Sequence, residues 1–178
     1  DYTSSKRPVS GKTKLPDELK DFMDNLDTAK IEIVCSEILT TKSLYIYGRN
    51  MSSLPAKYLY SMLNSMDIPC IYIDWIDFLQ ALSGTLPENT VLIIFTNYGE
   101  KTIYQPIVDR CHKRNVKIIW ISSTDIDHSL IVPSDTYIWT QEQNLEHVHL
   151  RTKMTSFLFV QIIVEYLRSN VKEQEDLV

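Results

Sequence analysis

The chain has 178 residues, of which 44% are hydrophobic and 23% charged, an ordinary composition for one domain with a sizeable core. Its formal net charge of −5 argues against nucleic-acid binding by these residues alone, because that would require a basic face. No apolar run approaches the ~18–20 residues of a membrane-spanning helix, and three scattered cysteines indicate free thiols in a reducing cytoplasm rather than a disulfide framework.

The chain begins with a polar segment that is followed by two predicted helices. Residues 1–14 hold few large apolar side chains and are expected to form a flexible linker. From Leu15 apolar residues recur at helical spacing, with Pro16 in the first turn, and a second helix is predicted over residues 27–40. We expect these lead-in helices, within residues 15–42, to pack on the following domain or on a partner.

Short β-rich runs then alternate with helical patterns over residues 43–170. The runs at 91–95 and 116–121 are almost continuously apolar, which is typical of strands covered by helices on both faces. Repeated βα units with short connections predict a parallel sheet, so the fold class is α/β, a three-layer sandwich with five strands. The predicted strands are at residues 43–47, 68–73, 91–95, 116–121 and 136–139. The predicted helices of this domain are at residues 52–66, 75–82, 101–114 and 152–169.

The last of these helices is apolar on more than one side. Phe157, Leu158, Ile162 and Ile163 do not share a single face, so the helix must be buried against two surroundings. In a domain of this size we interpret the second as another subunit, which predicts a homodimer or a higher even oligomer. Residues 171–178 are expected to form a charged tail.

Polar residues collect where three of the predicted strands end, at residues 48–53, 96–102 and 122–125. Hydroxyls and free amides at the carboxyl edge of a parallel sheet suit a phosphate or a sugar. The alternative is that these residues only cap helices, which Ser, Thr, Asn and Asp commonly do.

The order and spacing of these features resemble the SIS (sugar isomerase) domain, and more narrowly the effector domain of RpiR-type bacterial transcription regulators. The resemblance covers residues 26–167, and it depends on several motifs taken together. Those motifs are Ile46-Tyr47-Gly48-Arg49, Ser52-Ser53 with Ala56-Lys57, Gly99-Glu100, the strand end at 118–121, Pro133-Ser134-Asp135 and the helix after Arg151.

The resemblance implies a flavodoxin-like strand order 2-1-3-4-5 and a phosphosugar site at the carboxyl ends of the strands. It also implies a cytoplasmic regulator without enzymatic activity, metal or cofactor. Its DNA-binding helix-turn-helix domain would precede these residues, since a chain starting at Asp1 suggests part of a longer protein. The implied ligand-binding residues are Gly48, Asn50, Ser52, Ser53, Thr96, Asn97, Tyr98, Gly99, Lys101 and Thr102.

Both ligand loops depart from the family pattern. Asn50 stands where the first turn usually has a second glycine, and asparagine tolerates positive φ better than most residues. In the third turn Tyr98 replaces a small serine, Lys101 replaces a threonine, and Thr102 comes one residue late. Lys101 can supply charge in place of a hydroxyl bond, or it can point to solvent while Tyr98 fills the pocket.

Two other functions stay open at this point. One is a stand-alone phosphosugar isomerase, and the other is a degenerate SIS module that only dimerises. Glu146 is a candidate base for the enzyme, but no partner for it is evident. His147 and His149 are spaced as metal ligands on a strand can be, but no further ligand has a recognisable spacing. The favoured hypothesis is a phosphosugar-sensing and oligomerising domain that binds a sugar phosphate or an amino-sugar phosphate.

Overall fold

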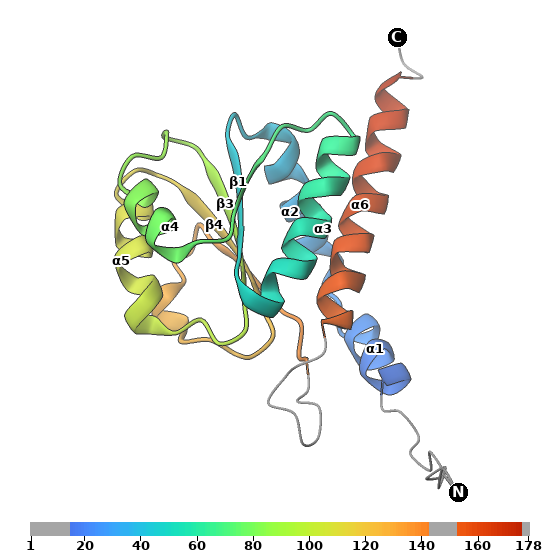
Figure 1. The fold of residues 1–178 in the computed structure, drawn as a ribbon. Coiled ribbons are helices and arrows are strands. Elements are labelled where there is room, and N and C mark those ends of the chain that lie inside the picture. The colour runs from blue at the N-terminus through green and yellow to red at the C-terminus, as the bar shows by residue number, and fades with distance from the viewer. Residues whose placement is uncertain (1–14, 143–152, 176–178) are drawn as a thin grey trace, which may run out of the picture.

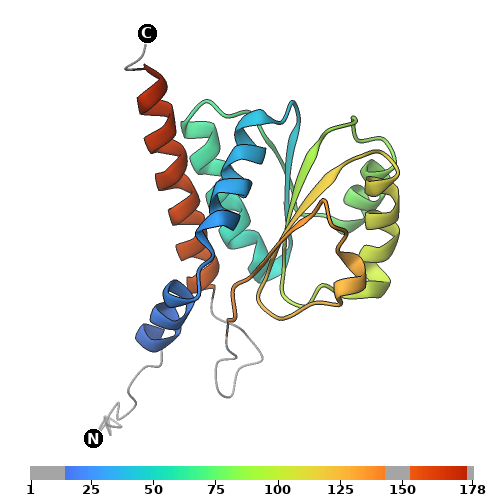
Figure 2. The same ribbon diagram turned by 180° about the vertical axis from the view of Figure 1, so that it is seen from behind.

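The computed structural model describes residues 15–142 and 153–175, with side chains described as far as residue 170. Within this part the predicted alternation of strands and helices is confirmed (Figure 1 and Figure 2). The strands are β1 (Leu44–Gly48), β2 (Ile71–Ile73), β3 (Val91–Thr96), β4 (Lys117–Ser122) and β5 (Thr136–Trp139). The helices are α1 (Leu15–Asp24), α2 (Thr28–Thr40), α3 (Ser53–Ser65), α4 (Ile76–Ser83), α5 (Lys101–His112) and α6 (Met154–Glu175), with short 3₁₀ turns η1 (Asn50–Ser52) and η2 (His128–Leu130).

All strands lie in one parallel sheet with the order β2-β1-β3-β4-β5. In β1, Ile46 pairs with Tyr72 of β2 on one side and with Ile93 of β3 on the other. The strand order therefore reverses at β1, where the chain passes to the opposite side of its first strand. This confirms the predicted α/β sandwich and its strand order.

Helices cover both faces of the sheet and divide the core into two layers (Figure 1). All six residues of β3 are buried, and they alternate between the layers. Ile93 and Phe95 face the layer formed with α2, α3 and α6, whereas Leu92 and Ile94 face the layer formed with α4 and α5. The continuous apolar run at 91–95 arises because each face of this strand meets helices.

The two lead-in helices pack on the following domain, which is one of the two predicted alternatives. α1 packs against α6, and α2 packs against α6 and β5. Phe22 of α1 and Val34 of α2 are buried in the same layer as Phe159 of α6. These helices thus complete one outer layer of the sandwich.

Two local predictions differ from the structure. Strand β2 begins at Ile71 rather than at residue 68, consistent with the missing N–H of Pro69. Helix α6 runs to Glu175, beyond the predicted end at residue 169. Trp75 is 64% exposed on this chain. None of the described helices is both long and apolar enough to cross a membrane.

The three cysteines are free thiols. Cys35 and Cys111 are buried, and Cys70 is partly buried. Burial raises the pKa of Cys35 and of Cys111 to about 12, and that of Cys70 to about 11. All three therefore stay protonated near neutral pH, and they act as small apolar groups rather than nucleophiles.

Candidate functional site

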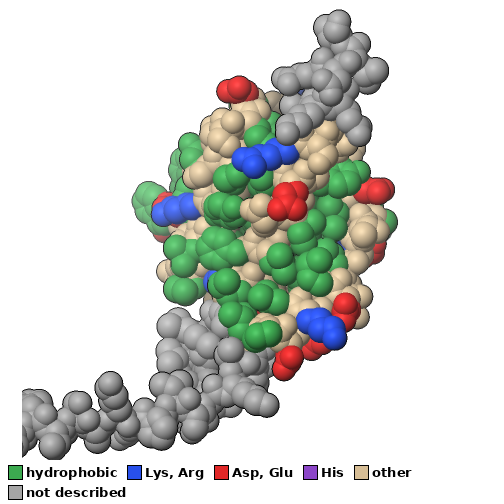
Figure 3. Space-filling view, turned by 90° about the vertical axis from the view of Figure 1, so that its right-hand side faces the viewer, with side chains coloured by type: hydrophobic (Ala, Val, Ile, Leu, Met, Phe, Trp, Pro, Cys, Tyr) green, Lys and Arg blue, Asp and Glu red, His purple; other side chains and the backbone are tan. Residues whose placement is uncertain are grey.

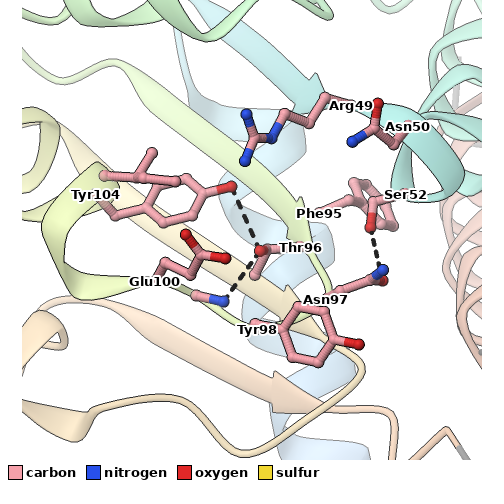
Figure 4. Close-up of a pocket in the computed structure, with 11 residues that line it drawn as sticks. Arg49, Asn50, Ser52, Phe95, Thr96, Asn97, Tyr98, Glu100 and Tyr104 are labelled. Carbon is pink, nitrogen blue, oxygen red and sulfur yellow. Dashed lines mark hydrogen bonds between the residues drawn. The ribbon is translucent and has the colours of Figure 1, made fainter. Parts of the chain in front are cut away.

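A pocket of about 180 Å³ opens where β1 and β3 end (Figure 4). Because the strand order reverses between these strands, the pocket lies at the switch point at which open α/β sheets bind ligands. Its walls come from the first turn, the third turn and the start of α5. The lining residues are Arg49, Asn50, Ser52, Phe95, Thr96, Asn97, Tyr98, Gly99, Glu100, Ile103 and Tyr104.

The first turn is shaped by the backbone at Gly48 and Asn50. A Cβ atom on Gly48 would lie 2.6 Å from the carbonyl oxygen of Ser52 and 2.7 Å from Cβ of Ala56, so only glycine fits there. Asn50 has a φ of 52°, the left-handed conformation that glycine adopts most easily and that asparagine tolerates. The backbone of the turn can therefore adopt a glycine-like conformation although asparagine replaces the second glycine.

The two adjacent serines of this turn already donate hydrogen bonds within the protein. Ser53 Oγ donates to the carbonyl oxygen of Asn50 at 2.6 Å, and Ser53 does not line the pocket. Ser52 is buried, and its Oγ donates to Oδ1 of Asn97 at 3.1 Å. A ligand that accepts from either hydroxyl would have to replace one of these bonds.

The third turn leaves one hydroxyl proton for the pocket. Oγ1 of Thr96 accepts from the backbone N–H of Gly99 at 3.1 Å and from the Tyr104 hydroxyl at 3.3 Å (Figure 4). No described residue is recorded as accepting the proton of Thr96 itself. Gly99 has a φ of 54°, and a Cβ there would lie 2.5 Å from Cγ2 of Ile126, so this turn requires glycine.

Two opposite charges face each other across the pocket. Arg49 extends its guanidinium over the end of β3, and Glu100 extends its carboxylate from the start of α5 (Figure 4). Burial raises the pKa of the Tyr104 phenol between them; Arg49 opposes this effect and Glu100 adds to it. Among the described residues, Arg49 has no recorded hydrogen bond or ion pair, so its charge is open to an anion.

Tyr98 occupies the rim of the pocket rather than its interior. Its side chain is 51% exposed, and the ring stands beside Thr96 and Asn97 (Figure 4). The bulk that replaces the small serine therefore narrows the entrance and leaves the space above Thr96 open.

Lys101 and Thr102 do not line the pocket. Lys101 turns to η2, where its Nζ donates to Oγ of Ser129 at 2.7 Å and lies 3.3 Å from Oδ2 of Asp127. Hydrogen bonds from Ser129 and the charge of Lys101 lower the pKa of Asp127 to about 2. Lys101 therefore points away from the pocket toward η2, but Tyr98 does not fill the pocket as the alternative prediction had it.

Of the predicted site residues, the structure brings Asn50, Ser52, Thr96, Asn97, Tyr98 and Gly99 to the pocket wall. Sequence reasoning missed Arg49 and Glu100, although both belong to motifs that carry the resemblance. Each follows directly after a turn glycine at the carboxyl edge of the sheet, and this position could have indicated that they line the ligand pocket. The residues Glu146, His147, His149 and Arg151 lie outside the described residues, and the described part contains no cluster of three potential metal ligands.

Comparison with protein-family models finds no match, and no curated sequence matches the chain. Solved structures do match its fold. The RpiR transcription factor sugar isomerase domain from Sphaerobacter thermophilus aligns with a TM-score of 0.71 and 13% identity, covering 90% of this chain and 93% of that one. The chain has the SIS fold. The same SIS fold appears in Vibrio vulnificus NanR complexed with ManNAc-6P, with a TM-score of 0.75, 15% identity and 90% of this chain covered.

This chain spans 62% of the length of that NanR chain. A phosphoheptose isomerase from Francisella tularensis also shares the SIS fold, with a TM-score of 0.66, 13% identity and coverage of 86% of this chain and 92% of that one. The solved SIS structures that resemble the chain therefore include both regulators and isomerases.

Proposed function

We propose that this chain is a phosphosugar-sensing domain of an RpiR-type regulator. The observation that carries the proposal is Arg49, a cation in the switch-point pocket with no recorded partner among the described residues. An arginine fork matches the oxygens of a phosphate and pairs with it through charge-assisted hydrogen bonds. The neighbour complexed with ManNAc-6P supports this class of ligand.

In the proposed complex the phosphate lies between the first and third turns. Arg49 supplies the charge, and the free hydroxyl proton of Thr96 donates a further bond. Asn50, Ser52, Asn97, Tyr98 and Gly99 complete the wall, while Gly48 keeps the turn close to the ligand. Lys101, Thr102 and Ser53 take no direct part in this arrangement.

Glu100 favours an amino-sugar phosphate over a neutral sugar phosphate. Its carboxylate lines the same pocket as Arg49, so an anionic ligand alone would leave an unfavourable negative pair. A ligand with a free ammonium group opposite its phosphate would match both charges. We therefore place the sugar amine on the side of α5.

Sensing rather than catalysis is favoured by the groups available at the pocket. Aldose–ketose isomerisation moves a proton between neighbouring carbons, and it needs a positioned acid–base group. Among the described lining residues Glu100 is the one acidic group, and it is exposed. Turnover of glucosamine 6-phosphate or glucose 6-phosphate by the purified chain would contradict the regulator and support an isomerase.

A ligand panel tests the sensing function by thermal unfolding. At about 100 times the Kd, glucosamine 6-phosphate should raise the Tm by about 5 °C or more, because binding to the folded state contributes about 2.7 kcal/mol. Glucose 6-phosphate should stabilise less, and glucose itself should have no effect. Absence of stabilisation by every sugar phosphate at millimolar concentration would rule out this function.

The E100Q variant tests whether the Glu100 carboxylate selects a ligand with an amine. It keeps the shape of the side chain and removes its charge, so the preference for glucosamine 6-phosphate over glucose 6-phosphate should disappear. If the preference is unchanged in E100Q, the carboxylate does not select the ligand.

We further propose that the sensor works as a dimer through α6. Met154, Leu158, Ile162 and Tyr166 follow one another at four-residue intervals, and each is partly or largely exposed. They form an apolar stripe along α6, and hydrophobic side chains gather on the side of the molecule shown in Figure 3. Such a stripe on a helix that already buries its other side suits a second copy of the chain.

Sedimentation velocity of the I162D variant tests this interface. The unaltered chain should sediment as a dimer at micromolar concentration, and I162D as a monomer, because a carboxylate would be buried against an apolar surface. F78D changes an equally apolar side chain that is 51% exposed on α4 and should leave the dimer intact. A monomeric unaltered chain would contradict the proposed interface.

In the longer regulator that we propose, DNA contacts would come from a helix-turn-helix domain outside these residues. Ligand binding would bias the arrangement of the dimer and so the spacing of the DNA-binding domains, provided the ligand binds two arrangements with different affinity. Such a regulator would act in the cytoplasm, where free thiols such as Cys35 and Cys111 persist.

A further inference from the structure

A buried lysine lies next to the pocket at the start of α6. Lys153 is 6% exposed and Glu142, on the chain after β5, is 1% exposed. Lys153 Nζ lies 2.8 Å from Oε2 of Glu142, and it also donates to Oδ1 of Asn97 and to Oγ of Ser123. A lysine this deep requires such partners, because an unpaired buried charge is very unfavourable.

The lysine determines which way the carboxamide of Asn97 points. An ammonium group donates and never accepts, so the Asn97 atom that faces Lys153 must be the oxygen. The same oxygen accepts from Ser52 Oγ at 3.1 Å. The amide nitrogen is thereby left with two protons for which no described residue is recorded as an acceptor, on a side chain that lines the pocket.

We propose that Lys153 is a positioning residue of the ligand pocket, which holds the Asn97 carboxamide with its oxygen inward so that the amide nitrogen donates to an anionic ligand. The proposal rests on the proposed function, because it takes an anion as the ligand. Without the lysine, either end of the carboxamide could face the pocket. The reversed amide would present its oxygen to the anion and repel it.

Glu142 holds the lysine in place and extends the network to α6. Its Oε2 accepts from Ser123 Oγ at 2.6 Å, and its Oε1 accepts from the backbone N–H of Ser156 at 3.1 Å. The turns after β3 and β4, the chain after β5 and the first turn of α6 are therefore joined through one ion pair. The Asn97 carboxamide is thus connected through Lys153 and Glu142 to the start of the helix that carries the apolar stripe.

The test is NMR spectroscopy of the ¹⁵N-labelled full chain, with inorganic phosphate as the probe. The side-chain amide signals of Asn97 are assigned from their absence in N97D. The K153M/E142Q variant removes both charges, so neither is left buried and unpaired. In the ligand-free variant the Asn97 signals should move, and its phosphate affinity should be about tenfold lower, which corresponds to the loss of one charge-directed hydrogen bond.

Three further variants separate positioning from a general loss of structure. Adding N97A to K153M/E142Q should weaken phosphate binding no further, since both changes remove the same contact. K153R keeps a cation with several donors beside Glu142 and should retain most of the affinity that K153M/E142Q loses. K117M/E37Q removes the ion pair of Lys117 and Glu37 at the opposite end of β4, and the Asn97 signals should stay in place.

The results that would contradict the positioning role differ from those that would contradict the anion site. Unmoved Asn97 signals in ligand-free K153M/E142Q, or independent effects of N97A and K153M/E142Q on phosphate affinity, would overturn the positioning role. If phosphate fails to shift the Asn97 signals of the unaltered chain, the anion site and hence the proposed function fail. In that case the ligand-free spectra still show whether Lys153 orients the amide.

Discussion

The R49M variant is expected to bind sugar phosphates about 100-fold more weakly than the unaltered chain, a loss of about 3 kcal/mol. Arg49 is the one basic residue among the described residues that line the pocket, so the phosphate would lose its only direct charge partner there. Isothermal titration calorimetry with glucosamine 6-phosphate measures the change. The far-UV circular dichroism and the Tm should stay close to those of the unaltered chain, because Arg49 has no recorded bond to another described residue.

K101M is the matched control for R49M. It removes a positive charge from the same edge of the sheet, but Lys101 is turned toward Asp127 and Ser129. We expect its affinity to change by less than about threefold, the size of a screened charge effect at the surface. If K101M loses as much affinity as R49M, the lysine rather than the arginine holds the phosphate. R49K should recover only part of the affinity, since lysine lacks the planar fork.

The D135A variant is expected to lower the free energy of unfolding by about 3–5 kcal/mol, which makes it the largest stability effect that we predict. The Asp135 side chain is fully buried and accepts from the backbone N–H groups of Ile118 at 3.0 Å and Val132 at 3.2 Å. Its Oδ2 also lies 3.0 Å from Nε2 of His112. Alanine would leave all three groups without this acceptor, and urea unfolding measures the cost.

D125A provides the comparison for D135A. Asp125 likewise pairs with a histidine, since its Oδ1 lies 2.9 Å from Nε2 of His128, but the pair is largely exposed. Its removal should have little effect on the urea midpoint because water replaces the lost contacts. Equal effects of D125A and D135A would mean that burial of the Asp135 carboxylate is not what makes it important.

The elements of the fold were predictable from the sequence because strand and helix patterns are local. The apolar runs at 91–95 and 116–121 correctly indicated strands buried on both faces, and the spacing of apolar residues located α6. The strand order came from the family resemblance rather than from the residues themselves. The end of α6 was predicted too early, since the charged residues after 169 were taken as a tail although they continue the helix.

The pocket wall was only partly predictable, because side-chain direction depends on residues far away in the sequence. Lys101 was a reasonable candidate for binding the ligand from the sequence alone. In the folded chain it bonds to Asp127 and Ser129, more than 25 residues later, and so points away from the pocket. Arg49 belongs to the very turn that pointed to ligand binding, but a turn of unknown geometry does not reveal which side chain enters the pocket. Lys153 could not be paired with Glu142 and Asn97 until the folded chain brought three separate loops together.

The hydrogen bond from the Ser156 N–H to Glu142 makes deuterium exchange at this amide a measure of local opening at the start of α6. Amide protons in the first turn of a helix usually exchange quickly with solvent, because they have no partner in the preceding turn. The Ser156 N–H instead donates to the carboxylate of Glu142, a residue that is only 1% exposed. Its deuterium exchange should therefore be slow. The exchange rate at this single amide would therefore measure how often the Ser156–Glu142 hydrogen bond opens while the rest of the chain stays folded.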